Sequence, residues 1–290
     1  MKHLLSSALL TIAATCAASL LHPLHAQTPG VDFPKASPAA SIKEQVGLAS
    51  VAIDYSRPSA RGRKIFGSLV PFGEVWRTGA NEATKITFGA EVTFGGELVP
   101  AGTYGLFTIP GEKEWTVILN KVSGQWGSYA YDAKNDQVRI KVAPTHLAEP
   151  TETFLISVGD LKDDGASVSF AWESTRVSIK LHSEVVKVIV PQIEAAMKAE
   201  GKKPYFPSAM FYYEHGLDLK QALAWMEEAL KEQPDAVWMV YRKGLIQAKA
   251  GDKPGALATG KQALALAEKA GGAIGAEYKR LCESLIASVK

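Results

Sequence analysis

The chain has 290 residues, of which 47% are hydrophobic and 21% are charged, and its formal net charge is +2. This length has room for two domains of ordinary size, and the hydrophobic content is typical of a globular protein. The near balance of charges differs from the strongly basic composition of nucleic-acid-binding proteins, so no nucleic-acid partner is predicted.

The first 26 residues have the pattern of a secretory signal peptide. A short polar start precedes an apolar run over residues 4–21, and the pattern predicts cleavage after Ala26. The residues before Cys16 make a poor lipoprotein signal, so a soluble exported protein is favoured over an anchored one. We therefore expect a periplasmic or extracellular protein with no integral membrane segment after cleavage.

The mature chain is poor in residues that form disulfides or bind metals. Cleavage leaves Cys282 as the only cysteine, so no internal disulfide is predicted. The remaining histidines, His146, His182 and His215, lie far apart in the sequence, and no pair has the spacing of metal ligands. The sequence predicts neither a metal site nor a cofactor.

The pattern of the next part of the chain is that of an all-β domain. Residues 27–45 carry Pro, Ala and Ser and suit a flexible leader. From residue 46 to residue 182, apolar and polar residues alternate in short runs between turn signals such as Gly95-Gly96. Two of these runs, 168–172 and 177–181, are predicted as separate strands. The pattern predicts eight or nine short strands in an antiparallel β-sandwich or flattened barrel.

The hydrophobic period changes at residue 183, where an α-helical domain over residues 183–290 is predicted. Ser183 is predicted to cap a first helix that contains Pro191 as a kink. A last helix is predicted around residues 274–289. The chain is therefore expected to be an α+β multidomain protein.

A repeat with an offset of 34 residues runs through the helical part. Ala222-Leu223-Ala224 recurs as Ala256-Leu257-Ala258, and Ala229-Leu230 recurs as Ala263-Leu264. These segments resemble tetratricopeptide repeats, in which small residues let paired helices approach closely. The second unit departs from that pattern at Gly260, where a large apolar residue is usual. The resemblance implies an array of helical hairpins that binds a protein partner.

Residues 54–86 contain four arginines, a tryptophan, an asparagine and three carboxylates, with closely spaced Gly and Pro residues between them. Arg presents a planar donor fork that suits a carboxylate or phosphate, and Trp presents a flat apolar face. Two interpretations stay open: a surface for a small anionic or sugar ligand, and an ordered loop in which these residues are structural. The candidate ligand-binding residues are Arg57, Arg63, Trp76, Arg77, Asn81 and Glu82.

The structural interpretation makes a specific prediction for two of these residues. Arg77 and Glu82 are five residues apart across Gly79, so a tight loop can place their side chains together. A buried ion pair between them would make the loss of Arg77 cost about 3–5 kcal/mol, because the carboxylate would lose its partner. A position facing a pocket would make the same change cost under about 1 kcal/mol.

Several long segments of the β region carry a family resemblance. The segments are Tyr55-Ser-Arg-Pro, Gly62-Arg-Lys-Ile-Phe-Gly, Val75-Trp-Arg-Thr-Gly-Ala-Asn-Glu-Ala-Thr, Pro100-Ala-Gly-Thr-Tyr-Gly-Leu-Phe-Thr-Ile-Pro, Trp115-Thr-Val-Ile-Leu-Asn and Trp126-Gly. They are similar to the signature of domain-of-unknown-function family 2911, a family of exported bacterial proteins, and the similarity covers most of residues 46–182. The resemblance implies no particular activity.

Searches for catalytic patterns identify no nucleophile elbow, zinc-binding or redox motif. Residues 255–262 have the glycine spacing of a phosphate loop, but Gln262 replaces the required hydroxyl and the segment lies in a predicted helix. The aromatic loop at 126–131 suits a sugar site or interface packing. We therefore expect a non-catalytic exported binding protein of the cell envelope. The alternative is a hydrolase or other small-molecule enzyme whose site lies between Arg57 and Glu82.

Overall fold

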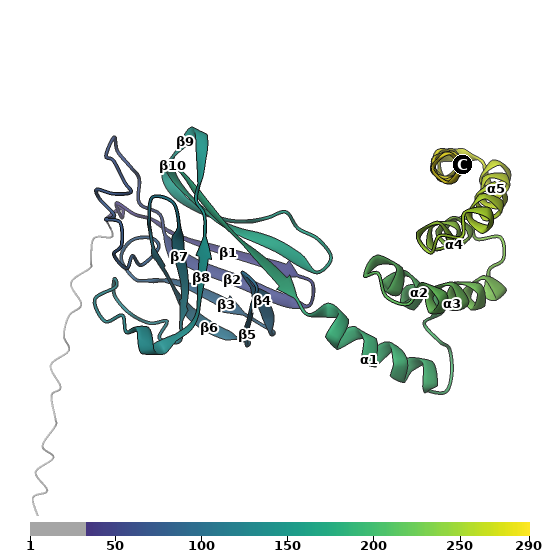
Figure 1. Ribbon diagram of the computed structural model, residues 1–290, viewed down its shortest axis with the longest axis horizontal. Helices are drawn as coiled ribbons and strands as arrows, with labels where there is room; N and C mark the ends of the chain where they lie inside the picture. The colour runs from purple at the N-terminus through teal and green to yellow at the C-terminus, as the bar shows by residue number, and fades with distance from the viewer. Residues whose placement is uncertain (1–32) are drawn as a thin grey trace, which may run out of the picture. The chain divides into compact units, whose positions relative to one another are not determined.

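The computed structural model describes residues 33–290, which contain two antiparallel sheets and six α-helices (Figure 1). The predicted signal peptide, residues 1–26, lies outside the described residues. The first sheet has the order β1 (Ala39–Val46), β2 (Ala49–Ser56), β3 (Thr84–Phe88), β6 (Gly102–Ile109), β7 (Trp115–Asn120), β8 (Asp136–Val142). The second has the order β5 (Glu97–Val99), β4 (Val92–Phe94), β10 (Gly165–Ser183), β9 (Thr145–Gly159).

The two sheets share one hydrophobic core. Alternate residues of β2, such as Val51 and Ile53, are buried and lie in the same cluster as Phe154 of β9 and Trp172 of β10. Side chains of a strand point alternately to its two faces, so the period of two in the sequence becomes one buried face per sheet. The predicted α+β class with an antiparallel β domain is confirmed, and the two sheets are not closed into a barrel.

The β domain begins earlier than the sequence predicts. Residues 39–46, most of which are expected in the flexible leader, form β1 and pair with β2 from Ala39 opposite Ser56 to Val46 opposite Ala49. Gly47 forms the connecting turn with a φ of 55°, a conformation that favours glycine. Only Val46 of β1 is fully buried, so the strand carries little of the hydrophobic signal that marks the others.

A second difference concerns the end of the β domain. The runs 168–172 and 177–181 are parts of a single strand, β10, and not two strands joined by a turn. The pairing of β10 with β9 shifts register between Ala171 and Glu173 and again between Glu173 and Thr175. These bulges interrupt the alternation of side chains without ending the strand, which explains why the sequence pattern reads as a break.

The helical part begins at α1 (Val185–Lys198), which contains Pro191 as predicted. The predicted cap at Ser183 is wrong, because Ser183 is still in β10 and its Oγ accepts a hydrogen bond from the Leu48 N–H at 3.1 Å. Glu184 occupies the N-cap position and makes no side-chain cap hydrogen bond. The other helices are α2 (Tyr205–Glu214), α3 (Leu219–Glu232), α4 (Val237–Lys249), α5 (Lys253–Ala270) and α6 (Gly272–Val289).

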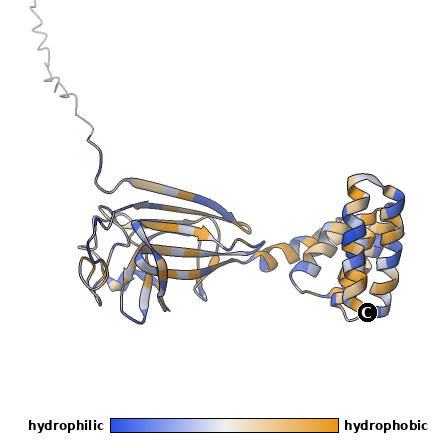
Figure 2. Cartoon of the chain, turned by 90° about the horizontal axis from the view of Figure 1, so that it is seen from above, coloured by the Kyte–Doolittle hydropathy of each residue, from blue (hydrophilic) through white to orange (hydrophobic). Residues whose placement is uncertain are grey.

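The 34-residue offset is visible in equivalent positions of α3 and α5. Asp218 caps α3 and Asp252 caps α5, each through a carboxylate that accepts hydrogen bonds from backbone N–H groups of the first turn. Ala222 of α3 and its equivalent in α5, Ala256, are both fully buried. Figure 2 shows hydrophobic and hydrophilic residues interspersed along the helical part of the chain. Within residues 33–290, no helix combines the length and hydrophobicity needed to cross a membrane.

Candidate functional site

The tryptophan of the Arg-rich stretch belongs to the core. Trp76 is only 7% exposed, and its Nε1–H donates a hydrogen bond to the Gly79 carbonyl at 3.1 Å. Its ring stacks on Trp172 and meets Phe154 and Phe66 edge-on. The flat face of this indole is therefore covered by other aromatic rings and is not a platform for a ligand.

Two of the candidate arginines bind backbone carbonyls. Arg57 Nε donates to the Phe154 carbonyl at 3.1 Å, which ties the end of β2 to β9. Arg63 donates from Nε to the Ala60 carbonyl at 2.9 Å and from Nη2 to the Ser59 carbonyl at 2.7 Å. Both guanidinium groups thus have partners within the β domain that fix the conformation of the loops around them.

Asn81 also has partners in the fold. Its backbone is in the left-handed region, with a φ of 61°. Its Nδ2 donates to Ser56 Oγ at 3.2 Å and to the Ser37 carbonyl at 3.4 Å. Asn tolerates this backbone conformation better than most residues, so the amide both permits and stabilises the turn.

The predicted ion pair between Arg77 and Glu82 is wrong. The Glu82 carboxylate is largely exposed and lies 3.1 Å from Lys85 Nζ. Val75, two residues before Arg77, packs with Phe107 in a small cluster separate from the main core. Arg77 Nε is buried, and no hydrogen-bond partner for it is found among the described residues.

The tertiary structure brings a second loop, residues 122–131, against the Arg-rich stretch. The Gly127 N–H donates to the Asn81 carbonyl at 3.0 Å, and the Ala83 N–H donates to the Gln125 carbonyl at 3.0 Å. Trp126 is 64% exposed and Tyr129 is 86% exposed in this loop. The sequence shows both segments but contains no signal that they adjoin, because their contact depends on how β7 and β8 are connected.

A hydrogen-bonded group anchors the far end of this loop. Tyr131 Oη donates to Asp136 Oδ2 at 2.7 Å, and Arg139 Nη1 donates to the same carboxylate oxygen at 2.7 Å. Burial and the neighbouring carboxylate raise the pKa of Tyr131 to about 12. Tyr131 therefore stays protonated at neutral pH and acts as a donor that holds the loop on the sheet.

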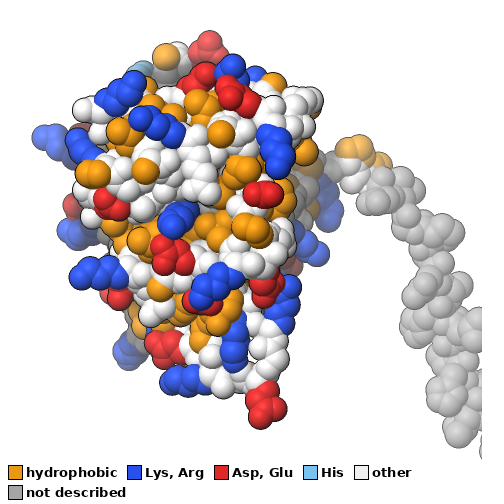
Figure 3. Space-filling view, turned by 90° about the vertical axis from the view of Figure 1, so that its right-hand side faces the viewer, with side chains coloured by type: hydrophobic (Ala, Val, Ile, Leu, Met, Phe, Trp, Pro, Cys, Tyr) orange, Lys and Arg blue, Asp and Glu red, His pale blue; other side chains and the backbone are white. Residues whose placement is uncertain are grey.

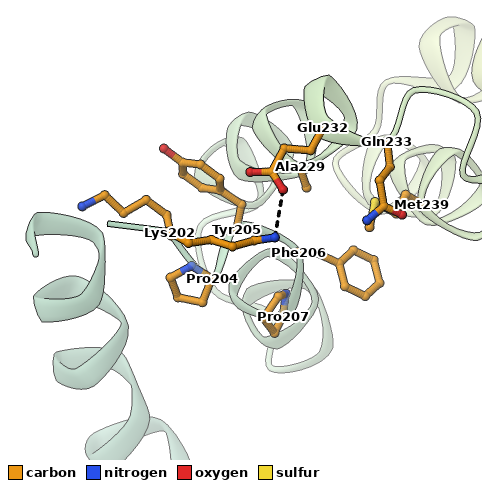
Figure 4. Close-up of a pocket in the computed structure, with 10 residues that line it drawn as sticks. Lys202, Pro204, Tyr205, Phe206, Pro207, Ala229, Glu232, Gln233 and Met239 are labelled. Carbon is orange, nitrogen blue, oxygen red and sulfur yellow. Dashed lines mark ion pairs between the residues drawn. The ribbon is translucent and has the colours of Figure 1, made fainter. Parts of the chain in front are cut away.

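The helical part contains a pocket that sequence reasoning did not identify. It has a volume of about 440 Å³ and lies beside the start of α2 and the end of α3. Figure 4 shows the side chains of Tyr205, Phe206 and Met239 around it, with Lys202 reaching toward Glu232. The aromatic pair between Pro204 and Pro207 is its only signal in the sequence. Among the described residues no group of three or more His, Cys, Asp or Glu side chains is placed to hold a metal ion.

The fold and these loops define a class of protein: an antiparallel two-sheet domain with elaborated loops, followed by an array of helices. The chain belongs to the family described as "Protein of unknown function (DUF2911)", whose model matches residues 37–181, half of the chain. The match begins two residues before β1 and ends in β10, so it covers the β domain as the structure defines it. No curated protein and no solved structure matches the chain.

Proposed function

We propose that this protein is an exported, non-catalytic binding protein of the bacterial cell envelope. In this proposal the helices α2 to α6 form a tetratricopeptide-like array that binds a segment of a protein partner. The observation that carries the proposal is the pocket of about 440 Å³ beside α2, because its volume falls within the range of about 300–1,000 Å³ that is common for binding sites.

The lining of this pocket is suited to an apolar side chain. The ring of Phe206 is partly exposed, and Met239 lies beside it with 8% of its surface exposed. Aromatic side chains and methionine are enriched at protein interfaces because they bury large areas and adapt to different partners. A leucine-sized or aromatic side chain of a partner segment would remove this surface from water.

Charge at the rim favours a carboxylate next to that side chain. Lys202 is neutralised by Glu232, whose carboxylate lies 3.1 Å from the Lys202 Nζ. Lys203 lines the pocket, and no ion pair for it is found among the described residues. Arg242 lies over the ring of Phe206, 5.9 Å from its centroid. Figure 3 shows one face of the molecule, on which charged side chains of both signs lie among hydrophobic ones. In this proposal Lys203 and Arg242 provide the selectivity for a carboxylate of the partner.

The repeat supports the array interpretation. Equivalent helices, α3 and α5, share their capping aspartate, their buried alanines and the offset of 34 residues. Val240 of α4, Ala263 of α5 and Cys282 of α6 form one buried cluster, so each helix buries its apolar face on a neighbour. This is the packing expected of stacked hairpins, which present one continuous surface to a partner.

Site-specific photo-crosslinking in envelope extracts tests the binding part of the proposal. A photoreactive residue in place of the exposed Pro207, at the pocket, should crosslink to a defined protein band. The same residue in place of Ile274, which is 60% exposed on α6, is the control and should not give that band. Met239→Arg, which places a charge in the pocket, should abolish the band at 207. Equal crosslinking at both positions, or a band that survives Met239→Arg, would contradict the proposal.

The export part rests on the pattern of residues 1–26 and has its own test. N-terminal sequencing of the protein from the envelope fraction should begin at Gln27. Retention of Met1 would show that the segment is not a cleaved signal peptide.

A further inference from the structure

We propose that the β domain has a binding site for a single neutral sugar ring in a cavity at one end of its two sheets. The cavity has a volume of about 220 Å³. It lies where the turn between β6 and β7 meets the connection between β8 and β9 and the bulged segment of β10. This site is separate from the helical pocket and does not depend on the proposed protein partner.

Both sheets contribute to the cavity. Trp115, the first residue of β7, comes from the six-stranded sheet, as does Glu112 in the turn before it. His146 of β9 and the pair Ser174 and Thr175 of β10 come from the four-stranded sheet. The bulge at Glu173, with its φ of 52°, changes the alternation of β10 just before the two hydroxyl-bearing residues. Bulges often redirect side chains next to binding sites.

The floor of the cavity is aromatic. Phe66 and Trp115 meet edge-on, with their ring centroids 4.7 Å apart. Both are nearly buried, so they close the base of the cavity, and the ring that can face a ligand is that of Phe72. Phe72 lies at the opening and is 38% exposed. Aromatic rings supply a rigid apolar surface, which suits the C–H groups on one face of a sugar ring.

Four polar residues line the wall of the cavity, and their side chains have no partner within the described part of the chain. Within residues 33–290, no side-chain hydrogen bond or ion pair is found for Glu112, His146, Ser174 or Thr175. The contrast with Glu114, two residues further along the same turn, is clear: its carboxylate lies 2.8 Å from Lys141 Nζ. The four side chains of the wall are therefore available to a ligand.

Size and hydrogen-bonding chemistry indicate the class of ligand. The volume is below the range of about 300–1,000 Å³ of typical drug-sized pockets, so it suits a ligand as small as one ring. The hydroxyls of Ser174 and Thr175 both donate and accept, as sugar hydroxyls do. The His146 ring adds a nitrogen donor, whereas the Glu112 carboxylate only accepts and would repel an anion. An organic cation would engage Glu112 and the rings but would leave the hydroxyl donors without acceptors.

Nuclear magnetic resonance on the full mature chain, labelled at nitrogen, tests this site. D-glucose, D-galactose and N-acetylglucosamine are titrated separately, and choline chloride serves as the cationic probe. We expect at least one sugar to shift the Trp115 indole N–H and the Ser174 amide while the exposed Trp126 indole stays in place. Trp115→Phe assigns the indole signal. A dissociation constant of about 1 mM would be ordinary for one small ring.

Matched variants of the β6–β7 turn complete the test. Glu112→Gln should weaken sugar binding about tenfold, because a charge-assisted hydrogen bond is replaced by a neutral one. Glu114→Gln, which removes the carboxylate paired with Lys141, should leave the dissociation constant unchanged. Four results would each overturn the proposal: no Trp115 shift with any of the three sugars, a shift of Trp126 in place of Trp115, a Trp115 shift with choline alone, or equal binding by both variants.

Discussion

Trp76 and Trp172 stack in the core of the β domain, with ring centroids 5.8 Å apart and an interplanar angle of 19°. Trp76 comes from the Arg-rich stretch between β2 and β3, and Trp172 comes from β10 in the other sheet. The Trp172 Nε1–H donates to the Glu152 carbonyl at 3.1 Å. The stack therefore holds the loop, the first sheet and the second sheet together at one point.

The first prediction follows from this stack. Trp76→Ala should lower the free energy of unfolding by about 3–5 kcal/mol, the usual cost of deleting a buried large aromatic side chain. Trp126→Ala is the control, because Trp126 is 64% exposed and its loss should change stability by no more than about 0.5 kcal/mol. Urea unfolding followed by far-ultraviolet circular dichroism measures both. Similar losses for the two variants would contradict the placement of Trp76 in the core.

The second prediction concerns Glu82. Its partner is Lys85, and both side chains are partly or largely exposed, so Glu82→Gln should cost no more than about 1 kcal/mol. A buried pair with Arg77 would have given a loss of about 3–5 kcal/mol. The midpoint of urea unfolding at low and high salt distinguishes the two cases. The small loss should shrink further in high salt, because exposed pairs are screened.

The third prediction compares Arg77 with Arg57. Both have the same side chain, but Arg57 Nε has a hydrogen-bond acceptor and Arg77 Nε has none among the described residues. Arg77→Met removes a buried Nε without a recorded partner, so the variant should be as stable as the native protein or more stable. Arg57→Met leaves the Phe154 carbonyl without its donor and should cost about 1–3 kcal/mol. Thermal unfolding of the two variants side by side measures the difference. A larger loss for Arg77→Met than for Arg57→Met would show that Arg77 has a structural partner.

The fourth prediction is a pH dependence. Cys282 is fully buried, and desolvation raises the pKa of its thiol from an ordinary value of 9.0 to about 11. Between these values the folded thiol keeps its proton while the unfolded thiol loses it, so folding stability falls as pH rises from about 9 to about 11. Cys282→Ala should remove this contribution to the fall of the unfolding free energy with pH. Unfolding free energies of both proteins at several pH values in this window measure it, and identical slopes would contradict the prediction.

The fifth prediction concerns cooperation among the helices. Removing residues 250–290 deletes α5 and α6, which cover Val240 and Tyr241 of α4. Because stacked helices bury their apolar faces on neighbours, residues 205–245 should lose hydrogen-exchange protection while the strands keep theirs. Hydrogen exchange on the truncated and full chains makes the comparison. Unchanged protection in 205–245 would mean that α2 to α4 are stable alone.

The sequence pattern predicts the strands that bury one face, but it fails where burial is weak or the alternation is interrupted. Val51 and Ile53 repeat at a period of two and lie in the core. β1 has partly exposed residues along its length and is missed, and β10 is divided at its bulges. Hydrophobic periodicity reflects burial and not hydrogen bonding, so it does not detect an exposed edge strand and it divides a bulged strand in two.

The candidate site shows a different limit. The residue types between Arg57 and Glu82 are visible in the sequence, but their partners are not. Trp76 turns into the core, Glu82 meets Lys85, and the loop with Trp126 lies beside Asn81. Each of these outcomes depends on the register of strands that are distant in sequence, and residue type alone does not encode that register.

By itself, the sequence determined the local features of this protein: the antiparallel strands with one apolar face, the change to helical period near residue 183 and the 34-residue offset that equates Ala222 with Ala256. Only the tertiary structure decided which side chains meet. It placed Glu112 and Trp115 across a cavity from His146 and Ser174, and it separated Arg77 from Glu82. The physical reason is that burial patterns act within a few residues, whereas a binding site joins loops whose proximity arises from sheet pairing and packing.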